Sequence, residues 1–282
     1  MAGPDQSWFT ETLHAGVAQR LVISRLIHHG RTEWQEVMVF DNPVFGRVVA
    51  LDGALQVTER DEFIYHEMLT HVPILAHGRV RRVLIMGGGD GGILRRCLMH
   101  AGVAEVTMVE IDGEFVELMR RHVPSISAGA FEDARVRLVI GDGAEFMRMA
   151  RDFDVIIVDS TDPTGPGAVL FSPEFYADCQ KALTPGGVLV TQSGVPFLQD
   201  EELTLVQARL GAVFADATCY QASIPTYYGG AMAFGWASDD AGLRRHDRAA
   251  LAARYEAAGL VTRYYTPEIH QASFALPGYF CR

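Results

Sequence analysis

The chain has 282 residues, of which 24 are basic and 35 acidic, giving a formal net charge of −11, and 49% are hydrophobic. This length suits one domain with an appendage or two modest domains, and the acidic balance disfavours a nucleic-acid-binding surface. No apolar run reaches the roughly 18 residues of a membrane span, and the N-terminus lacks signal-peptide blocks, so we expect a cytoplasmic protein. The 4 cysteines form no CxxC pair, which favours reduced thiols over a disulfide frame or a zinc site.

The first 70 residues are rich in β-favouring runs. Three runs, at residues 21–23, 34–40 and 47–51, are separated by turn-forming residues. We therefore expect a small antiparallel β domain over residues 1–70 and a second domain over residues 71–282. The spacing of apolar residues from Asp61 to His77 predicts a helix that bridges the two despite Pro73, and this helix carries Tyr65 and His66.

A glycine-rich stretch follows the apolar run at residues 83–86 and leads into a helix-like segment at 93–100. This order predicts a strand, a nucleotide-binding loop and a helix, with the backbone close to a ligand at the helix N-terminus. A tight strand-to-helix turn also favours glycine, so the spacing alone leaves a purely structural role open. Asp90 is the unusual member, because a carboxylate here repels a pyrophosphate and attracts a cation. A positively charged cosubstrate therefore fits better than NAD.

Beyond this loop, strand-like and helix-like segments alternate. The predicted strands are residues 106–111, 136–140, 155–158 and 188–191, the predicted helices are 114–121, 143–150, 173–183 and 201–209, and closing strands are expected near 219–220 and 232–236. The alternation predicts an α/β fold with a doubly wound, mainly parallel, Rossmann-like sheet beside the N-terminal β domain.

Acidic residues stand at four successive strand ends, where such folds bind their ligands. Asp90 follows the first strand, Glu110 ends the second, Asp142 follows the third and Asp159 closes the fourth. Glu110 suits ribose hydroxyls and Asp142 an adenine amino group, although a surface glutamate and a helix N-cap are their ordinary roles. Asp162 follows Asp159 by three residues, and a turn role before the next proline is its alternative.

An ordered set of motifs carries a family resemblance over nearly the whole chain. The motifs are Trp8-Phe9-Thr10-Glu11, Leu51-Asp52-Gly53-Ala54-Leu55-Gln56, Asp61-Glu62-Phe63-Ile64-Tyr65-His66-Glu67, Gly87-Gly88-Gly89-Asp90-Gly91, Val109-Glu110-Ile111-Asp112, Gly141-Asp142-Gly143, Asp159-Ser160-Thr161-Asp162-Pro163 and Pro225-Thr226-Tyr227. Together they resemble the polyamine aminopropyltransferases, specifically bacterial-type spermidine synthases. The chain departs from the common family motifs at two positions. Thr161 stands in place of a second serine, and His66 stands where some members carry glutamine.

The resemblance implies transfer of an aminopropyl group from decarboxylated S-adenosylmethionine to putrescine, which releases spermidine, methylthioadenosine and a proton. The decarboxylated donor keeps its sulfonium and ammonium but has no carboxylate, so Asp90 would pair with the ammonium and oppose S-adenosylmethionine itself. By the same resemblance, the nucleoside is held by Gln35, Glu110, Asp142, Gly143 and Pro166.

Putrescine arrives as a dication, and an ammonium has no lone pair with which to attack carbon. The resemblance implies that Asp159 removes the proton as general base, with Tyr65 and Tyr227 holding the amine. A role for the two tyrosines as aromatic residues at the edge of the core stays open. No metal or other cofactor is expected, because the leaving group departs as a neutral thioether.

Three further substrate contacts are implied. Asp162 would fix the diamine near its reacting end, and Trp8 would line its aliphatic stem. His66 would contribute a hydrogen bond when neutral, whereas a charged His66 would oppose cationic ligands. The family also implies a homodimer or higher homo-oligomer built partly through the N-terminal module, with no nucleic-acid or membrane partner.

Three other functions compete with this interpretation. An S-adenosylmethionine-dependent N-methyltransferase acting on a diamine would use the same class I methyltransferase-like sheet, but Asp90 argues against it. A non-catalytic polyamine- or nucleoside-binding protein would predict loss of Asp159 or the tyrosines, which are present. An NAD-dependent oxidoreductase lacks an identifiable second nucleotide half or hydride-site histidine. The choice among putrescine, cadaverine and spermidine as acceptor stays open.

Overall fold

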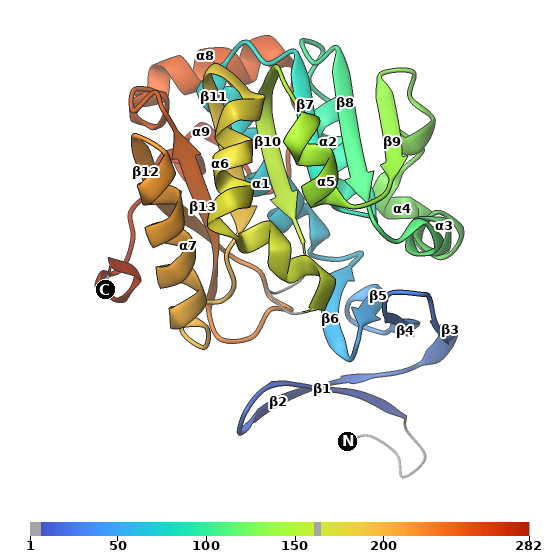
Figure 1. Ribbon diagram of the computed structural model, residues 1–282. Helices are drawn as coiled ribbons and strands as arrows, with labels where there is room; N and C mark the ends of the chain where they lie inside the picture. Colours follow the sequence, from blue (N-terminus) through green and yellow to red (C-terminus); the bar gives the residue numbers. More distant parts are fainter. Residues whose placement is uncertain (1–6, 161–164, 282) are drawn as a thin grey trace.

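The computed structural model describes residues 7–160 and 165–281. Its N-terminal part consists of two small antiparallel sheets (Figure 1). The first is a hairpin of β1 (Trp8–His14) and β2 (Val17–Val22). The second is a four-stranded meander of β3 (Arg25–Arg31), β4 (Glu36–Asn42), β5 (Gly46–Leu51) and β6 (Ala54–Thr58). The antiparallel N-terminal domain predicted from the β-favouring runs is confirmed.

The strands β4 and β5 of the meander carry buried side chains on both faces, and these contacts fix the position of the meander beside the rest of the molecule. Val37 and Val49 on one face pack with Phe115 of the large domain, and Phe40 on the other face packs with Phe9 of the hairpin. Fully burying an aliphatic or aromatic side chain contributes about 1.5–3 kcal/mol. These contacts hold the small domain across the ligand-binding edge of the large one.

The helix α1 (Glu62–His77) connects the two parts. It ends at Gly78, whose left-handed φ of 79° allows its N–H to bond the carbonyl of Ile74. Nearly all its side chains are buried because it packs against α2 and β11 on one face of the large sheet. The small sheets end at Thr58, so the predicted boundary at residue 70 lies within this helix.

A seven-stranded sheet forms the centre of the described chain, in the order β12-β13-β11-β10-β7-β8-β9. Its parallel strands are β7 (Arg82–Gly87), β8 (Glu105–Glu110), β9 (Val136–Ile140), β10 (Phe153–Asp159) and β11 (Leu183–Gln192). The hairpin of β12 (Asp216–Ser223) and β13 (Ala231–Ser238) adds to this sheet, with β13 antiparallel to β11. The predicted doubly wound, mainly parallel fold is confirmed.

Helices cover both faces of this sheet (Figure 1). They are α2 (Gly92–Leu98), α3 (Gly113–His122), α4 (Pro124–Ser127), α5 (Gly143–Met149), α6 (Pro173–Ala182), α7 (Asp200–Val213), α8 (Arg248–Ala258) and α9 (Pro267–Ser273). Along β7, Val83 and Ile85 pack on the side of α1 and α2, while Leu84 and Met86 pack on the side of α5, α6 and α7. Burial on both faces explains the uninterrupted apolar run.

The strand order reverses between β7 and β10, and this position is where such sheets bind ligands. Asp159 at the end of β10 pairs with Gly87 at the end of β7. Gly87 has φ +81°, and an added Cβ would lie 2.1 Å from the Asp159 carbonyl oxygen. Only glycine therefore lets the first nucleotide-loop residue pass so close to Asp159. In the two described ranges, no helix is long and apolar enough to span a membrane.

Candidate active site

A cavity of about 600 Å³ opens at the carboxyl ends of the central strands. Its walls come from β1 and β6 of the small domain, α1, the glycine loop, the ends of β8 and β11, and the loop between β12 and β13. The cavity contains Asp90, Glu110, Asp142 and Asp159 together, as expected from the acidic strand ends.

Asp159 and Tyr65 form the centre of one end of the cavity. The Tyr65 hydroxyl donates a hydrogen bond of 2.5 Å to Asp159 Oδ1. Burial raises the pKa of Asp159 to about 6 and the negative charge of Asp90 adds to this, whereas the Tyr65 hydrogen bond and the nearby His66 oppose it. Asp159 is therefore ionised near neutral pH, yet basic enough to accept a proton. Burial also raises the pKa of Tyr65 well above its ordinary value, so Tyr65 stays a neutral donor.

The loop between β12 and β13 brings Tyr227 to the same end. Its ring lies edge-on to Tyr65 with centroids 6.0 Å apart, and its hydroxyl donates to the Gln56 carbonyl of β6. The preceding Thr226 donates from its backbone N–H and its hydroxyl to Asp61 at 3.0 and 2.7 Å. We call residues 224–228 the clasp, because these contacts tie the C-terminal half to the small domain and to the start of α1.

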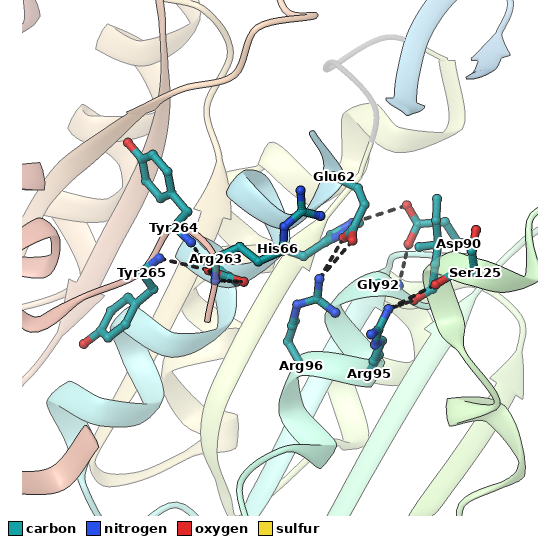
Figure 2. Close-up of polar contacts among 12 residues, drawn as sticks. Glu62, His66, Asp90, Gly92, Arg95, Arg96, Ser125, Arg263, Tyr264 and Tyr265 are labelled. Carbon is teal, nitrogen blue, oxygen red and sulfur yellow. Dashed lines mark hydrogen bonds and ion pairs between the residues drawn. The ribbon is translucent and has the colours of Figure 1, made fainter. Parts of the chain in front are cut away.

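Asp90 stands beside His66 (Figure 2). One of its oxygens accepts the Gly92 N–H at 2.7 Å, and the other lies 3.3 Å from His66 Nε2. Burial by itself lowers the pKa of His66, but the carboxylates of Asp90 and Glu62 outweigh it and raise that pKa to about 10. The two carboxylates therefore favour the imidazolium form of His66 in this arrangement.

The other end of the cavity holds the residues predicted for the nucleoside. Burial raises the pKa of Glu110 to about 7, although its Oε1 accepts the Asp112 N–H at 3.0 Å. Gln35 donates to Asp112 Oδ2 at 2.9 Å, so Asp112 orients it. Asp142 Oδ1 accepts the N–H groups of residues 144 and 145 at 2.7 and 3.0 Å. The helix N-cap weighed as the alternative for Asp142 is thus present, while both Asp142 and Gly143 line the cavity.

Of the three other predicted contacts, only Trp8 is placed outside this cluster. Trp8 is 37% exposed, carries the Arg20 guanidinium 5.0 Å from its ring centroid, and is not part of the cavity wall. Asp162 lies outside the described residues. Pro166 belongs to the short 3₁₀ helix Gly165–Phe171, whose Val169 lines the cavity. In the part of the chain that the structure describes, no group of three or more His, Cys, Asp or Glu side chains is arranged to hold a metal ion.

Comparison with known families agrees with this geometry. Residues 62–247 match the family described as the spermine/spermidine synthase domain, and residues 7–59 match the spermidine synthase tetramerisation domain. The chain belongs to the spermidine synthase family. It is 58% identical over 273 residues to a polyamine aminopropyltransferase of Ruegeria sp. (strain TM1040), covering 96% of both chains. It is 54% identical to polyamine aminopropyltransferase 1 of Pseudomonas aeruginosa, covering 96% of this chain and 95% of that one.

Solved structures of spermidine synthases have the same fold. A spermidine synthase in complex with the transition-state analogue AdoDATO matches with a TM-score of 0.93 and 38% identity, over 99% of this chain and 94% of that one. The spermidine synthase from Thermotoga maritima matches with a TM-score of 0.91 and 37% identity, over the same shares of the two chains. The protein is thus an enzyme, a polyamine aminopropyltransferase.

Sequence reasoning missed several residues that shape the site of this aminopropyltransferase. Glu11 is a buried carboxylate of the cavity wall and accepts hydrogen bonds from the Leu55 N–H at 2.8 Å and from Gln19 at 2.6 Å. Glu62 holds His66, and Asp112 holds Gln35. All three lie inside the quoted motifs. Nothing in their local sequence distinguishes a buried carboxylate from an exposed one, so their neighbourhood in the motifs was the only available signal.

Proposed function

We propose that this enzyme transfers the aminopropyl group of decarboxylated S-adenosylmethionine to putrescine, yielding spermidine, methylthioadenosine and a proton. The observation that carries the proposal is the pair of carboxylates, Asp90 and Asp159, which face one cavity from adjacent strand ends. Glu110 and Asp142 supply acceptors for a nucleoside in the same cavity. Two acidic centres beside a nucleoside site suit a cationic donor and a cationic acceptor.

Asp90 supports the choice of donor. Its carboxylate lies in the glycine loop, only 13% exposed, where a negative charge is weakly screened. The ammonium of the decarboxylated donor would be attracted, whereas the carboxylate of S-adenosylmethionine would be repelled at the same position. The likeness to a spermidine synthase solved with AdoDATO also supports a site for such a donor.

The proposed reaction starts with proton transfer from the putrescine ammonium to Asp159. The freed nitrogen attacks the methylene carbon beside the sulfonium, so that the C–N bond forms while the C–S bond breaks and its electron pair stays on sulfur. Asp159 then releases the proton to solvent. The raised pKa of Asp159, about 6, suits a base that works near neutral pH, and the Tyr65 hydrogen bond orients its oxygen. No metal or other cofactor is required, because a neutral thioether leaves.

The acceptor site extends toward the small domain. Glu11 gives that wall of the cavity a buried carboxylate, and the aromatic rings of Tyr65 and Tyr227 lie beside Asp159. A diamine fits this arrangement, because one nitrogen can reach Asp159 while the distal ammonium is drawn to negative charge. Asp162 and Trp8 remain proposed substrate contacts.

We also propose that the enzyme is a cytoplasmic homo-oligomer. Residues 7–59 match a tetramerisation domain, which supports assembly through the small β domain. Cys97 and Cys179 are buried free thiols, and burial raises the pKa of both, which keeps them unreactive. Unpaired cysteines are usual in a reducing compartment.

Mass spectrometry of the reaction products tests the proposal. The enzyme is incubated with putrescine and either sulfonium donor, and in parallel with cadaverine or spermidine as acceptor. We expect an aminopropyl gain on putrescine with the decarboxylated donor and little turnover with S-adenosylmethionine. Comparable turnover with both donors would contradict the role of Asp90. A mass gain of one methyl group would favour the N-methyltransferase instead.

A further inference from the structure

Four charged side chains form a buried row between α1 and α2, which we call the charge row: Arg96, Glu62, His66 and Asp90 (Figure 2). Arg96 donates to Glu62 at 2.9 and 3.2 Å, and Glu62 lies 2.7 Å from His66 Nδ1. At the cavity end, His66 Nε2 lies 3.3 Å from Asp90. Positive and negative groups alternate along the row, so its charges cancel pairwise.

The ring of His66 has no room to turn away from Asp90. It is 2% exposed, and a Cβ added at Gly92 would lie only 2.1 Å from its Cε1 atom. The Tyr65 ring lies edge-on with its centroid 5.6 Å away. Gly92 is thus needed for the backbone of α2 to approach the ring, and Nε2 stays directed at Asp90.

Glu62 determines which nitrogen of His66 can lose its proton. An ionised carboxylate only accepts hydrogen bonds, and although burial opposes ionisation, the contacts with His66 and Arg96 lower the pKa of Glu62. Nδ1 therefore keeps its hydrogen in both charge states of the ring. Only Nε2 exchanges a proton, as a donor to Asp90 in the imidazolium and as an acceptor in the neutral ring.

The charges around His66 come from several elements. Asp90 in the glycine loop, Glu62 on α1 and Asp159 on β10 favour its imidazolium form, and Tyr65 is neutral. On α2, Arg96 and Arg95 act on Glu62 and so reduce its effect on the ring. A ligand ammonium that pairs with Asp90 would add a positive charge next to Nε2 and reverse the balance.

We propose that His66 is an internal counter-cation of Asp90 whose proton is exchanged for the ammonium of the bound donor. As the ammonium pairs with Asp90, the Nε2–H bond breaks, its electron pair stays on nitrogen and the proton passes to bulk water. The Nε2 lone pair then accepts a hydrogen bond from that ammonium. One positive charge replaces another, so Asp90 is never left unpaired. Glu62 acts as a positioning residue that fixes the tautomer. This inference rests on the proposed function, because it takes the donor to be decarboxylated S-adenosylmethionine.

The exchange makes donor affinity depend on pH. If binding releases one proton, the dissociation constant of the donor falls by about tenfold for each unit by which the pH rises. This holds as long as His66 is charged beforehand and the ligand amine stays protonated. Methylthioadenosine lacks the aminopropyl ammonium and would leave His66 charged, so its affinity would not share this dependence. At about pH 8 Glu110, with a pKa of about 7, is mostly ionised before either ligand binds, so its titration contributes little proton release with either ligand.

Isothermal titration calorimetry at about pH 8, in two buffers of different ionisation enthalpy, counts the protons released. For the wild-type enzyme we expect about one more proton released with the decarboxylated donor than with methylthioadenosine. In His66→Gln this difference should vanish while methylthioadenosine affinity is kept. His77→Gln is the matched control on the same helix, outside the cavity wall, and should behave as wild type.

Equal proton counts for the two ligands in the wild-type enzyme would overturn the inference, as would an extra proton that persists in His66→Gln. If the aminopropylated product forms without the extra proton, only this inference fails and the proposed function stands. If the donor neither binds nor reacts, both fail.

Ring-nitrogen NMR of ¹⁵N-histidine-labelled wild-type enzyme gives a second measurement that needs no variant. The His66 signals should change from imidazolium to the neutral Nδ1–H tautomer with the donor only, and an unchanged charge state would contradict the exchange.

Discussion

Three consecutive residues of α1 serve two different regions of the molecule. Tyr65 and His66 line the cavity, whereas Glu67 bonds to the segment 263–265. This segment lies on the opposite side of His66 from Asp90 (Figure 2). Glu67 accepts backbone N–H groups from all three residues of that segment, at 2.8 to 3.2 Å. Among the described residues, Asp159 instead accepts a single side-chain hydrogen bond, from Tyr65. A carboxylate surrounded by amide donors joins parts of the chain, and one with a single donor and a cavity in front keeps its lone pairs for a ligand.

The largest effect expected from this comparison is on catalysis at Asp159. Asp159→Asn keeps the size but loses the charge and the basicity, so the rate at saturating putrescine should fall by about 10²–10⁴-fold. Methylthioadenosine affinity should change little, and raising the pH should partly restore the rate because more putrescine then carries a neutral nitrogen. Steady-state kinetics across pH measure this. Turnover near the wild-type level at saturating putrescine and neutral pH would rule out Asp159 as the base.

Glu67→Gln tests whether the carboxylate that bonds to the segment 263–265 serves stability rather than catalysis. The amide keeps one acceptor oxygen but turns an N–H₂ group toward backbone donors, so we expect the free energy of unfolding to fall by about 1–3 kcal/mol. Chemical denaturation measures the loss, and the turnover of the folded variant should stay close to wild type. A large loss of turnover with unchanged stability would mean that Glu67 belongs functionally with Asp159.

Glu110 lies between these two extremes, because it accepts one backbone N–H and also lines the cavity. At about pH 8, where Glu110 with its pKa of about 7 is mostly ionised, Glu110→Gln should weaken methylthioadenosine binding by about tenfold. The hydrogen bond from a ribose hydroxyl to a charged acceptor then becomes one to a neutral acceptor. Asp142→Asn should show a smaller loss, since it retains the oxygen that caps α5. Calorimetric affinities that match wild type in both variants would remove these residues from the nucleoside pocket.

The smallest expected effect is a shift in the pH profile. Because the pKa of Asp159 is raised to about 6, its ionised, basic form dominates above that pH. The kcat/KM for putrescine should therefore fall as the pH drops through this region. Tyr65 stabilises the ionised form, so Tyr65→Phe should move the acid limb upward by less than about one pH unit. A downward shift would show that the hydroxyl does not stabilise the Asp159 carboxylate.

The fold was largely predictable because the parallel strands, apart from the partly exposed edge strand β9, have stretches that are buried on both faces. This produces uninterrupted apolar runs such as Val155 to Val158, and the chain must turn where each run ends. The same physics made Asp90 and Asp159 visible, since a charged residue directly after a buried strand stands at the ligand-binding edge. The helices at 248–258 and 267–273 went unassigned. In the N-terminal domain, the β-favouring runs included only the end of β2 in the first hairpin and did not include β1, β3 or β6.

The charge row and the clasp could not be predicted from the sequence. Glu62 and His66 have the i, i+4 spacing of an ordinary surface pair, and only the packing of α1 against α2 buries them beside Arg96. The charge of His66 depends on two distances that no sequence pattern contains. The Tyr227 contact to Gln56 joins residues 171 positions apart, and a pairing at that separation leaves no local signal.

The clasp also determines when the binding site can be completed during synthesis. Translation proceeds from the N-terminus, so the glycine loop and all four acidic strand ends emerge before residues 224–228 do. Until then Asp61 and Gln56 lack their clasp partners, and the wall that carries Tyr227 is missing. A ligand therefore cannot assist the early steps of folding through this wall. The stabilising effect of contacts with this wall is confined to chains that have passed residue 228, after most of the central sheet has been made.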